Sequence, residues 1–183
     1  DLVSSRGLGD VYKRQGCDVG CHWCDVKESW DAEKHPPTEI STIIKNAKQY
    51  SDTIVVTGGE PLMWNMSPLT AGLRNENLAT HIETSGAYPL SGDWDWICLS
   101  PKKRMLPLDD IYKVADELKV IVYNQNDFVF GEEQAARVQP NCKLFLQPEW
   151  SKREQVMPMI VDYVLQHPKW KASLQTHKYM NIP

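Results

Sequence analysis

Residues 52–61, with the sequence DTIVVTGGEP, decide the fold class of this chain. The run at 54–56 has three consecutive branched apolar residues, which is typical of a parallel strand buried on both faces. It passes directly into Thr57, Gly58, Gly59 and Glu60, where the two glycines allow another group to approach the backbone closely. The stretch therefore predicts a parallel strand with a ligand-binding turn at its C-terminal end.

Four more strands are expected from short apolar segments at 81–83, 97–99, 120–122 and 144–146. Each of them ends in polar or small residues, at 84–86, 100–102, 123–124 and 147–149. Because the C-terminal ends of parallel strands share one edge of a sheet, these segments predict a pocket along that edge.

Helical patterns lie between the expected strands. Thr38 is the expected N-cap of a helix with apolar residues at positions 40, 43, 44 and 47, and further helices are expected at 109–117 and 127–138. Residues 151–154 have the form of a capping box, in a helix that Pro158 must kink or delay. The alternation predicts an α/β fold with a parallel sheet that closes, or partly closes, into a barrel.

Size and charge exclude several classes of protein. With 183 residues, 42% of them hydrophobic, the chain is expected to form one domain around one core. With a net charge of −4, the sequence gives no indication of a basic surface that would bind nucleic acid or an anionic membrane. No apolar stretch approaches the roughly 18 residues of a membrane span. A soluble protein that acts on small molecules is therefore expected.

Residues 5–15, SRGLGDVYKRQ, match the translation of a transposon-type sequencing adapter. An ordinary charged N-terminal arm is the alternative. We expect residues 1–15 to be non-native and the functional domain to comprise residues 16–183. Lys13 and Arg14 then carry no functional argument.

Three of the five cysteines lie within eight residues: Cys17, Cys21 and Cys24. This spacing suits a metal site better than disulfides, and the flanking Gly16 and Gly20 allow the backbone to wrap a cluster-sized object. With three thiolates and no fourth at matching spacing, one metal position would stay open for a reacting ligand. A zinc site completed by His22 or His35 is the alternative, as are unrelated buried cysteines.

The other two cysteines, Cys98 within an expected strand and Cys142 just before one, are expected in the core. An odd cysteine count with metal-type spacing indicates a reducing compartment, so a cytoplasmic location is expected.

The cysteine motif, with Trp23 just before its last cysteine, is followed after a strand by Gly-Gly-Glu-Pro at 58–61. This ordered pair resembles the radical S-adenosylmethionine superfamily. The resemblance implies a 4Fe-4S cluster on the three cysteines, with S-adenosylmethionine on the open iron. It also implies cleavage of that molecule to a 5′-deoxyadenosyl radical, which takes hydrogen from a substrate.

Within the superfamily, residues 16–183 are similar to the 7-carboxy-7-deazaguanine synthases. The segments that carry the similarity are 16–25, 57–61, 83–86, 100–102, 146–148 and 175–179. The residues expected at S-adenosylmethionine are Trp23, Asp25, Gly58, Gly59, Glu60, Ser100, Pro101, Lys102, Gln147, Pro148, Glu149 and Trp150. The residues expected at the substrate are Thr57, His177 and the C-terminal Pro183. No catalytic residue beyond the cluster ligands is implied.

Two departures from the family pattern bear on these expectations. The family often has Thr or Ser as a magnesium ligand two positions after the last cysteine, where this chain has Val26. Whether Mg2+ is a cofactor is therefore left open. The family also has a strand before the cysteine loop, with an Arg at the position of Lys13. Because residues 5–15 are adapter-like, we expect a partial (β/α) barrel of the radical S-adenosylmethionine type with its first strand missing.

The resemblance implies conversion of 6-carboxy-5,6,7,8-tetrahydropterin to 7-carboxy-7-deazaguanine with loss of ammonia, a lyase reaction in queuosine and deazapurine biosynthesis. It implies a flavodoxin- or ferredoxin-type reductant, and it leaves open whether the chain forms a homodimer. The rivals are a glycyl-radical-enzyme activase and a non-catalytic iron–sulfur or zinc module. The motifs at 100–102 and 177–179 speak against the activase, and the open metal position and strand-end pocket speak against the module.

Overall fold

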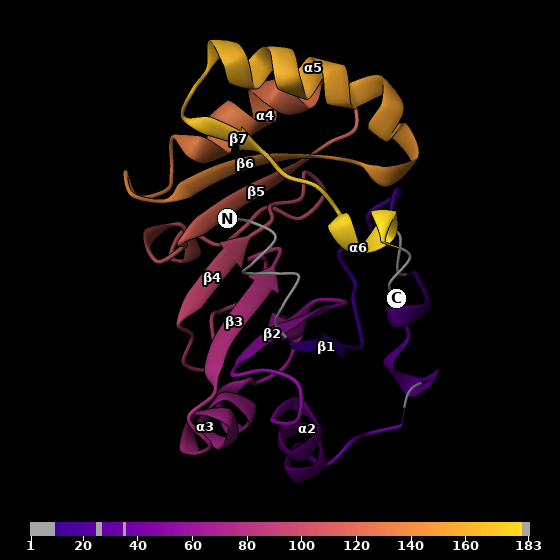
Figure 1. Cartoon of the computed structure of the whole chain (residues 1–183), viewed down its shortest axis with the longest axis vertical. Coiled ribbons are helices and arrows are strands. Elements are labelled where there is room, and N and C mark those ends of the chain that lie inside the picture. Colours follow the sequence, from indigo (N-terminus) through magenta and orange to yellow (C-terminus); the bar gives the residue numbers. More distant parts are fainter. Residues whose placement is uncertain (1–9, 25–26, 35, 181–183) are drawn as a thin grey trace.

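The computed structural model describes residues 10–24, 27–34 and 36–180, and contains one parallel sheet whose spatial order follows the sequence (Figure 1). Every neighbouring pair of strands is parallel. The two edges of the sheet are β1 and β7. The strands are β1 (Asp10–Arg14), β2 (Thr53–Gly58), β3 (Ala79–Thr84), β4 (Trp96–Leu99), β5 (Glu117–Val122), β6 (Lys143–Pro148) and β7 (Trp170–Ala172).

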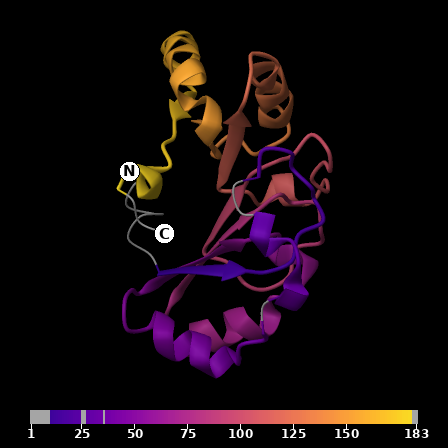
Figure 2. The same cartoon turned by 90° about the vertical axis from the view of Figure 1, so that its right-hand side faces the viewer.

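Helices join the strands and pack on one face of the sheet. Two of them, α2 (Ile40–Ala47) and α3 (Ser67–Asn75), lie beside the β1–β3 part, and α4 (Asn126–Ala135) and α5 (Arg153–Gln166) lie over the β5–β7 part (Figures 1 and 2). A short α6 (Thr176–Tyr179) follows β7. Single helical turns occur at η1 (Lys27–Ser29), η2 (Ala32–Lys34), η3 (Pro61–Met63), η4 (Ile111–Lys113) and η5 (Trp150–Lys152). Among the described helices, none is both long and apolar enough to cross a membrane.

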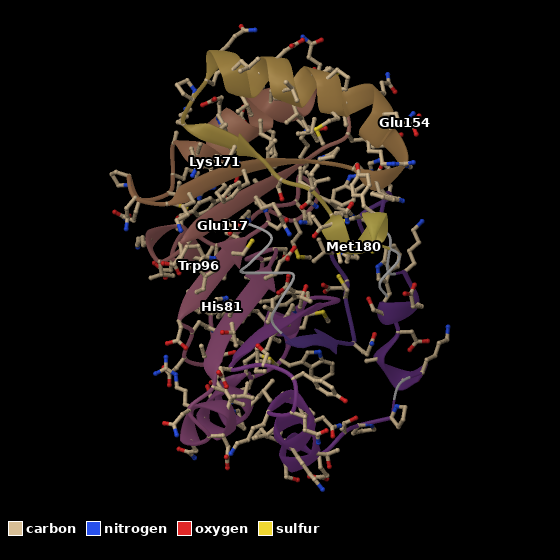
Figure 3. All side chains as sticks on the ribbon, viewed as in Figure 1. His81, Trp96, Glu117, Glu154, Lys171 and Met180 are labelled. Carbon is tan, nitrogen blue, oxygen red and sulfur yellow. The ribbon has the colours of Figure 1, made fainter. Side chains whose placement is uncertain are left out.

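The two faces of the sheet differ in chemistry. Apolar side chains from neighbouring strands, including Ile54, Leu99 and Val120, form a buried core with the helices. The opposite, inner face carries polar and aromatic side chains, among them His81, Trp96 and Glu117 on three successive strands (Figure 3). This arrangement is typical of a barrel whose outside packs on helices and whose inside serves a ligand.

The five predicted strands are confirmed, and each lies within one of β2 to β6. The helix expected at 109–117 is wrong, because only the turn η4 forms before β5 begins. The reason lies in Asp116, which exchanges two hydrogen bonds with Ile97 of β4, from its backbone N–H at 3.0 Å and to its carboxylate at 2.8 Å. These bonds draw the segment into the sheet.

The helix expected at 127–138 is confirmed as α4, which ends three residues earlier than expected. Two predictions about helix caps are wrong. Glu39, not Thr38, precedes the first turn of α2. The carboxylate of Glu149 accepts from the backbone N–H groups of Ser151 and Lys152, so it takes the place of the expected capping box. Pro158 lies inside α5.

The expectation that the first strand is missing is wrong. Residues 10–14 form β1 and pair in parallel with β2, with Val11 opposite Val55 and Lys13 opposite Thr57. The physical reason is that a ladder uses backbone groups, so an exposed edge of a sheet can pair with almost any extended segment. The non-native origin of residues 5–15 stays a prediction.

Candidate active site

A loop that follows β1 carries the three clustered cysteines, and we call residues 16–24 the cluster loop. Two of its glycines have positive φ angles, 98° at Gly16 and 63° at Gly20, where other residues would be strained. The backbone N–H of Gly16 donates to the carbonyl of Ser29 at 2.7 Å, which ties the start of the loop to η1. The thiols of the three cysteines, all free and partly buried, lie on this loop.

The end of β2 lies directly against the cluster loop. The backbone N–H of Glu60 donates to the carbonyl oxygen of Gly16 at 2.9 Å. A Cβ atom on Gly59 would overlap that oxygen and lie 2.8 Å from the carbonyl carbon. The Gly-Gly turn is predicted to let a ligand approach the backbone, and that stays a prediction; the structure shows that Gly59 lets the cluster loop approach.

The side chain of Glu60 joins the ends of β2 and β3. It is 2% exposed, and its carboxylate accepts from the Thr84 hydroxyl at 2.5 Å and from the backbone N–H of Ser85 at 2.7 Å. The Ser85 hydroxyl and the backbone N–H of Leu62 also donate to it. Four donors fill most of the lone-pair positions of a carboxylate, so Glu60 holds the architecture of the site as well as supplying negative charge beside it.

Glu60→Gln should therefore lower stability markedly. The amide NH2 group would face donors instead of accepting from them, which leaves buried groups unpaired at a cost of about 3 kcal/mol. Thermal unfolding of the two proteins measures this effect.

Glu76→Gln is the matched control, because Glu76 forms an exposed ion pair with Lys48 and such pairs contribute about 0–1 kcal/mol. Equal thermal midpoints for the two variants would contradict the structural role of Glu60.

Side chains after β3 and β4 also reach the cluster loop. The Tyr88 hydroxyl donates to the carboxylate of Asp18, and this hydrogen bond, together with smaller contributions, raises the pKa of Tyr88 to about 12. Arg104 donates to the carbonyl of Gly20 at 3.1 Å. These contacts fix the loop over the end of the sheet.

Lys102 places a cation at the centre of this edge. Its Nζ donates to the carbonyl oxygen of Ser100 at 2.5 Å and to the Ser100 hydroxyl at 2.7 Å, and it lies 5.7 Å from the centre of the Trp23 ring. Burial lowers the pKa of Lys102, and the neighbouring Cys21 works in the opposite direction. The predicted Ser100–Lys102 segment and the cluster loop are therefore brought together.

Burial raises the pKa of the Cys17 and Cys21 thiols. The cations of Lys102 and Arg104 lower the pKa of Cys21 in part. Metal loading must then displace thiol protons, because the thiolate is the form that binds a metal.

The ends of β5 and β6 complete the edge. The rings of His22 and Tyr123 meet edge to face with centroids 5.3 Å apart. Trp150 packs against Tyr179 of α6 at 5.0 Å, and the Lys178 ammonium lies 5.2 Å from the Trp150 ring centre. The contacts of Trp150 bring the C-terminal segment to the same edge, where Met180 is labelled (Figure 3).

The remaining predicted site residues have varied positions. Thr57 lies near the end of β2, and Pro101 is buried after β4. Gln147 accepts from the Ser173 hydroxyl at 3.0 Å. The side chains of Gln147 and Glu149 therefore already make contacts within the protein, and Glu149 does so as the N-cap of η5. Pro148 is the last residue of β6.

His177 lies at an exposed position on α6. Four site or motif residues of the sequence analysis lie outside the described residues, namely Asp25, Val26, His35 and Pro183, as do residues 5–9 of the adapter-like stretch.

The cysteine donor set fits an iron–sulfur cluster. In the part of the chain that the structure describes, no three His, Cys, Asp or Glu side chains gather closely enough to hold a single metal ion. A 4Fe-4S cluster binds each thiolate to a different iron, so its ligands need not converge on one point. His22, the described candidate for completing a zinc site, packs on Tyr123.

Sequence reasoning missed several residues of this edge. Tyr88 and Arg104 are 70 and 84 positions from their partners in the cluster loop, so no local pattern marks them. Lys119 of β5 is 4% exposed and pairs with Glu83 of β3 on the inner face. A lysine directly before the apolar run at 120–122 is the sequence signal that could have found this pair.

Comparisons with known proteins agree with the fold and the site. Residues 11–98 match the family model described as the Radical SAM superfamily. A 7-carboxy-7-deazaguanine synthase of Flavobacterium psychrophilum is 66% identical over 168 residues, which cover 92% of this chain and 80% of that protein. A 7-carboxy-7-deazaguanine synthase of a Synechocystis species is 46% identical, covering 91% and 80%.

Among solved structures, QueE from Escherichia coli superposes with a TM-score of 0.76 at 25% identity, and the match covers 90% of this chain and 84% of that one. The predicted partial barrel of the radical S-adenosylmethionine type is thereby confirmed.

Proposed function

This chain belongs to the 7-carboxy-7-deazaguanine synthase family, and we propose that it converts 6-carboxy-5,6,7,8-tetrahydropterin to 7-carboxy-7-deazaguanine with loss of ammonia. The observation that carries the proposal is the convergence on one cluster loop of groups from the ends of four strands, β2 to β5. By reaction type the enzyme is a lyase.

In the proposal, Cys17, Cys21 and Cys24 hold a 4Fe-4S cluster. When bound, the cluster supplies one electron that cleaves S-adenosylmethionine to methionine and a 5′-deoxyadenosyl radical. The protein's own residues position the cysteines, because Gly59 and Glu60 hold the cluster loop against the end of β2.

S-adenosylmethionine is assigned to the turn after β2 and to the segments after β4 and β6. Its methionyl carboxylate is negative, and Lys102 offers a partly desolvated cation close to the cluster loop. Trp23 lies 5.7 Å from that cation and presents a ring on which an adenine can stack. Ser100 orients Lys102 through two hydrogen bonds.

The pterin is assigned to Thr57, His177 and the carboxylate of Pro183. The packing of Trp150 on Tyr179 supports this assignment, since it holds the C-terminal segment at the same edge as the end of β2. A free carboxylate can accept paired N–H bonds from the 2-aminopyrimidinone edge of a pterin.

Further parts of the proposal concern partners and setting. We assign a flavodoxin- or ferredoxin-type reductant, and the five free cysteines support a reducing cytoplasm. Val26 has no oxygen for Mg2+ where the family often has Thr or Ser, so the proposal includes no side-chain magnesium ligand there. A homodimer is left open.

Anaerobic reconstitution with iron, sulfide, S-adenosylmethionine and a reductant tests the function. With the pterin deuterated at C6, we expect deazaguanine product and deuterium in the recovered S-adenosylmethionine, because a cofactor used catalytically must take back the hydrogen it removed. Mass spectrometry measures both. Stoichiometric 5′-deoxyadenosine without deazaguanine would reject the proposal and favour an activase.

A further inference from the structure

Trp30 contacts both ends of the cluster loop. Its backbone carbonyl accepts from the N–H of Cys17 at 3.3 Å, and its indole Nε1–H donates to the Sγ of Cys24 at 3.3 Å. Its own N–H donates to the carbonyl of Lys27 at 3.2 Å, which makes it part of the turn at η1. The residue is therefore held in place by its backbone while its side chain points at a cluster ligand.

The hydrogen bond to Cys24 has a direction that matters for redox chemistry. An indole N–H can only donate, so the sulfur must act as acceptor. The sulfur of a cysteine bound to iron carries negative charge, and that charge increases when the cluster takes up an electron. A donor at this sulfur therefore stabilises the reduced state more than the oxidised state, and hydrogen bonds to sulfur are a recognised means of setting cluster potentials.

The surroundings of Trp30 strengthen this effect. Trp30 and Cys24 are both partly buried, and a partly desolvated donor interacts more strongly than one in bulk water. The Lys27 ammonium lies 6.0 Å from the centre of the Trp30 ring, on the side of η1. The indole is thus held between a turn of the backbone and the thiol.

We infer that Trp30 is a positioning residue that raises the reduction potential of the cluster through its N–H bond to Cys24. The inference rests on the proposed function only in that a cluster occupies the three cysteines. It goes beyond that function because it assigns part of the control of the potential to one side chain outside the cysteine motif.

Trp30→Phe tests the inference, because it keeps an aromatic ring and removes the N–H. We expect a normal iron content and a lower midpoint potential in a dithionite titration followed by electron paramagnetic resonance. At a fixed ambient potential, the ratio of reduced to oxidised cluster should fall about threefold to tenfold, where tenfold corresponds to 59 mV for a one-electron couple.

Trp64→Phe is the matched control. The Trp64 indole also lies beside the cluster loop, where a Cβ on Gly16 would meet its ring at 3.3 Å, and its N–H donates to the backbone carbonyl of Gln15 at 3.1 Å. We expect its midpoint potential to equal that of the unmodified protein. A Trp30→Phe potential that is also unchanged, at full iron content, overturns the inference.

If Trp30→Phe does not load iron, benzothienylalanine at position 30 repeats the test, since it retains the bicyclic shape and replaces the N–H with sulfur. A lowered potential supports the inference, and an unchanged one rejects it. Failure of the unmodified protein to bind any cluster would instead reject the proposed function, so the two failures are distinguishable.

Discussion

Replacing Cys17, Cys21 or Cys24 singly with Ala should abolish the iron–sulfur absorbance and all turnover. Each thiolate binds a different iron in the proposed cluster, so the loss of one leaves an iron without its protein ligand. The three cysteines share one short loop, and no neighbouring cysteine is available in sequence to replace them. Iron and sulfide analysis after anaerobic reconstitution, with the visible spectrum, measures the outcome.

Cys98→Ala and Cys142→Ala are the matched controls. The Cys98 thiol donates to Glu117 at 3.4 Å inside the sheet, and burial is the largest cause that raises the pKa of Cys142 to about 12. Both thiols are buried away from the cluster loop, and their removal should cost about 1 kcal/mol of stability while leaving iron content unchanged. Zinc without iron in the anaerobically purified protein would contradict the cluster assignment.

The sheet could be predicted from the sequence because each of its central strands has a local signal. The runs within β2, β5 and β6 are apolar at consecutive positions, which requires burial on both faces and hence a parallel sheet. Parallel pairing then places all strand ends at one edge. For the same reason, the sequence alone assigns the segments after β2 and β4 to one site.

What the sequence left out depends on contacts between distant segments. The predicted helix at 109–117 does not form because the hydrogen bonds between Asp116 and Ile97 override the helical pattern of the segment. β1 was not predicted because residues 5–15 are adapter-like, but backbone pairing at an open edge demands little of the side chains. The bond between Tyr88 and Asp18 likewise exists only once β3 and the cluster loop lie together.

Glu60 shows a subtler difference between pattern and structure. Its place in the Gly-Gly-Glu-Pro motif indicated a residue that faces the cofactor. In the structure its carboxylate receives four donors from the ends of β2 and β3. A motif can therefore mark a residue that also builds the site, and its hydrogen-bond partners reveal that second role.

Gly59→Ala should remove most of the cluster and destabilise the protein. The φ angle of Gly59 is not positive, so Ala could adopt the backbone conformation, and the effect arises from contact alone. The new Cβ would overlap the carbonyl of Gly16 and lie 3.1 Å from the Cβ of Cys17. Because both neighbours belong to the backbone or to its first side-chain atom, they cannot rotate away. The cluster loop must move, which breaks the 2.9 Å bond from Glu60 to Gly16.

Overpacking of this kind costs about 1–3 kcal/mol, and the displaced Cys17 should leave iron content well below that of the unmodified protein. Gly131→Ala is the matched control, because a Cβ there meets its nearest neighbour, Trp170, at an ordinary 3.5 Å, inside α4. Ala is a better helix former than Gly by about 0.8–1.0 kcal/mol, so this variant should unfold at a higher temperature with full iron content. The thermal midpoints of the two variants should therefore move in opposite directions, and only Gly59→Ala should lose iron. Normal cluster loading in Gly59→Ala would mean that the loop and the end of β2 are not held together by this close approach.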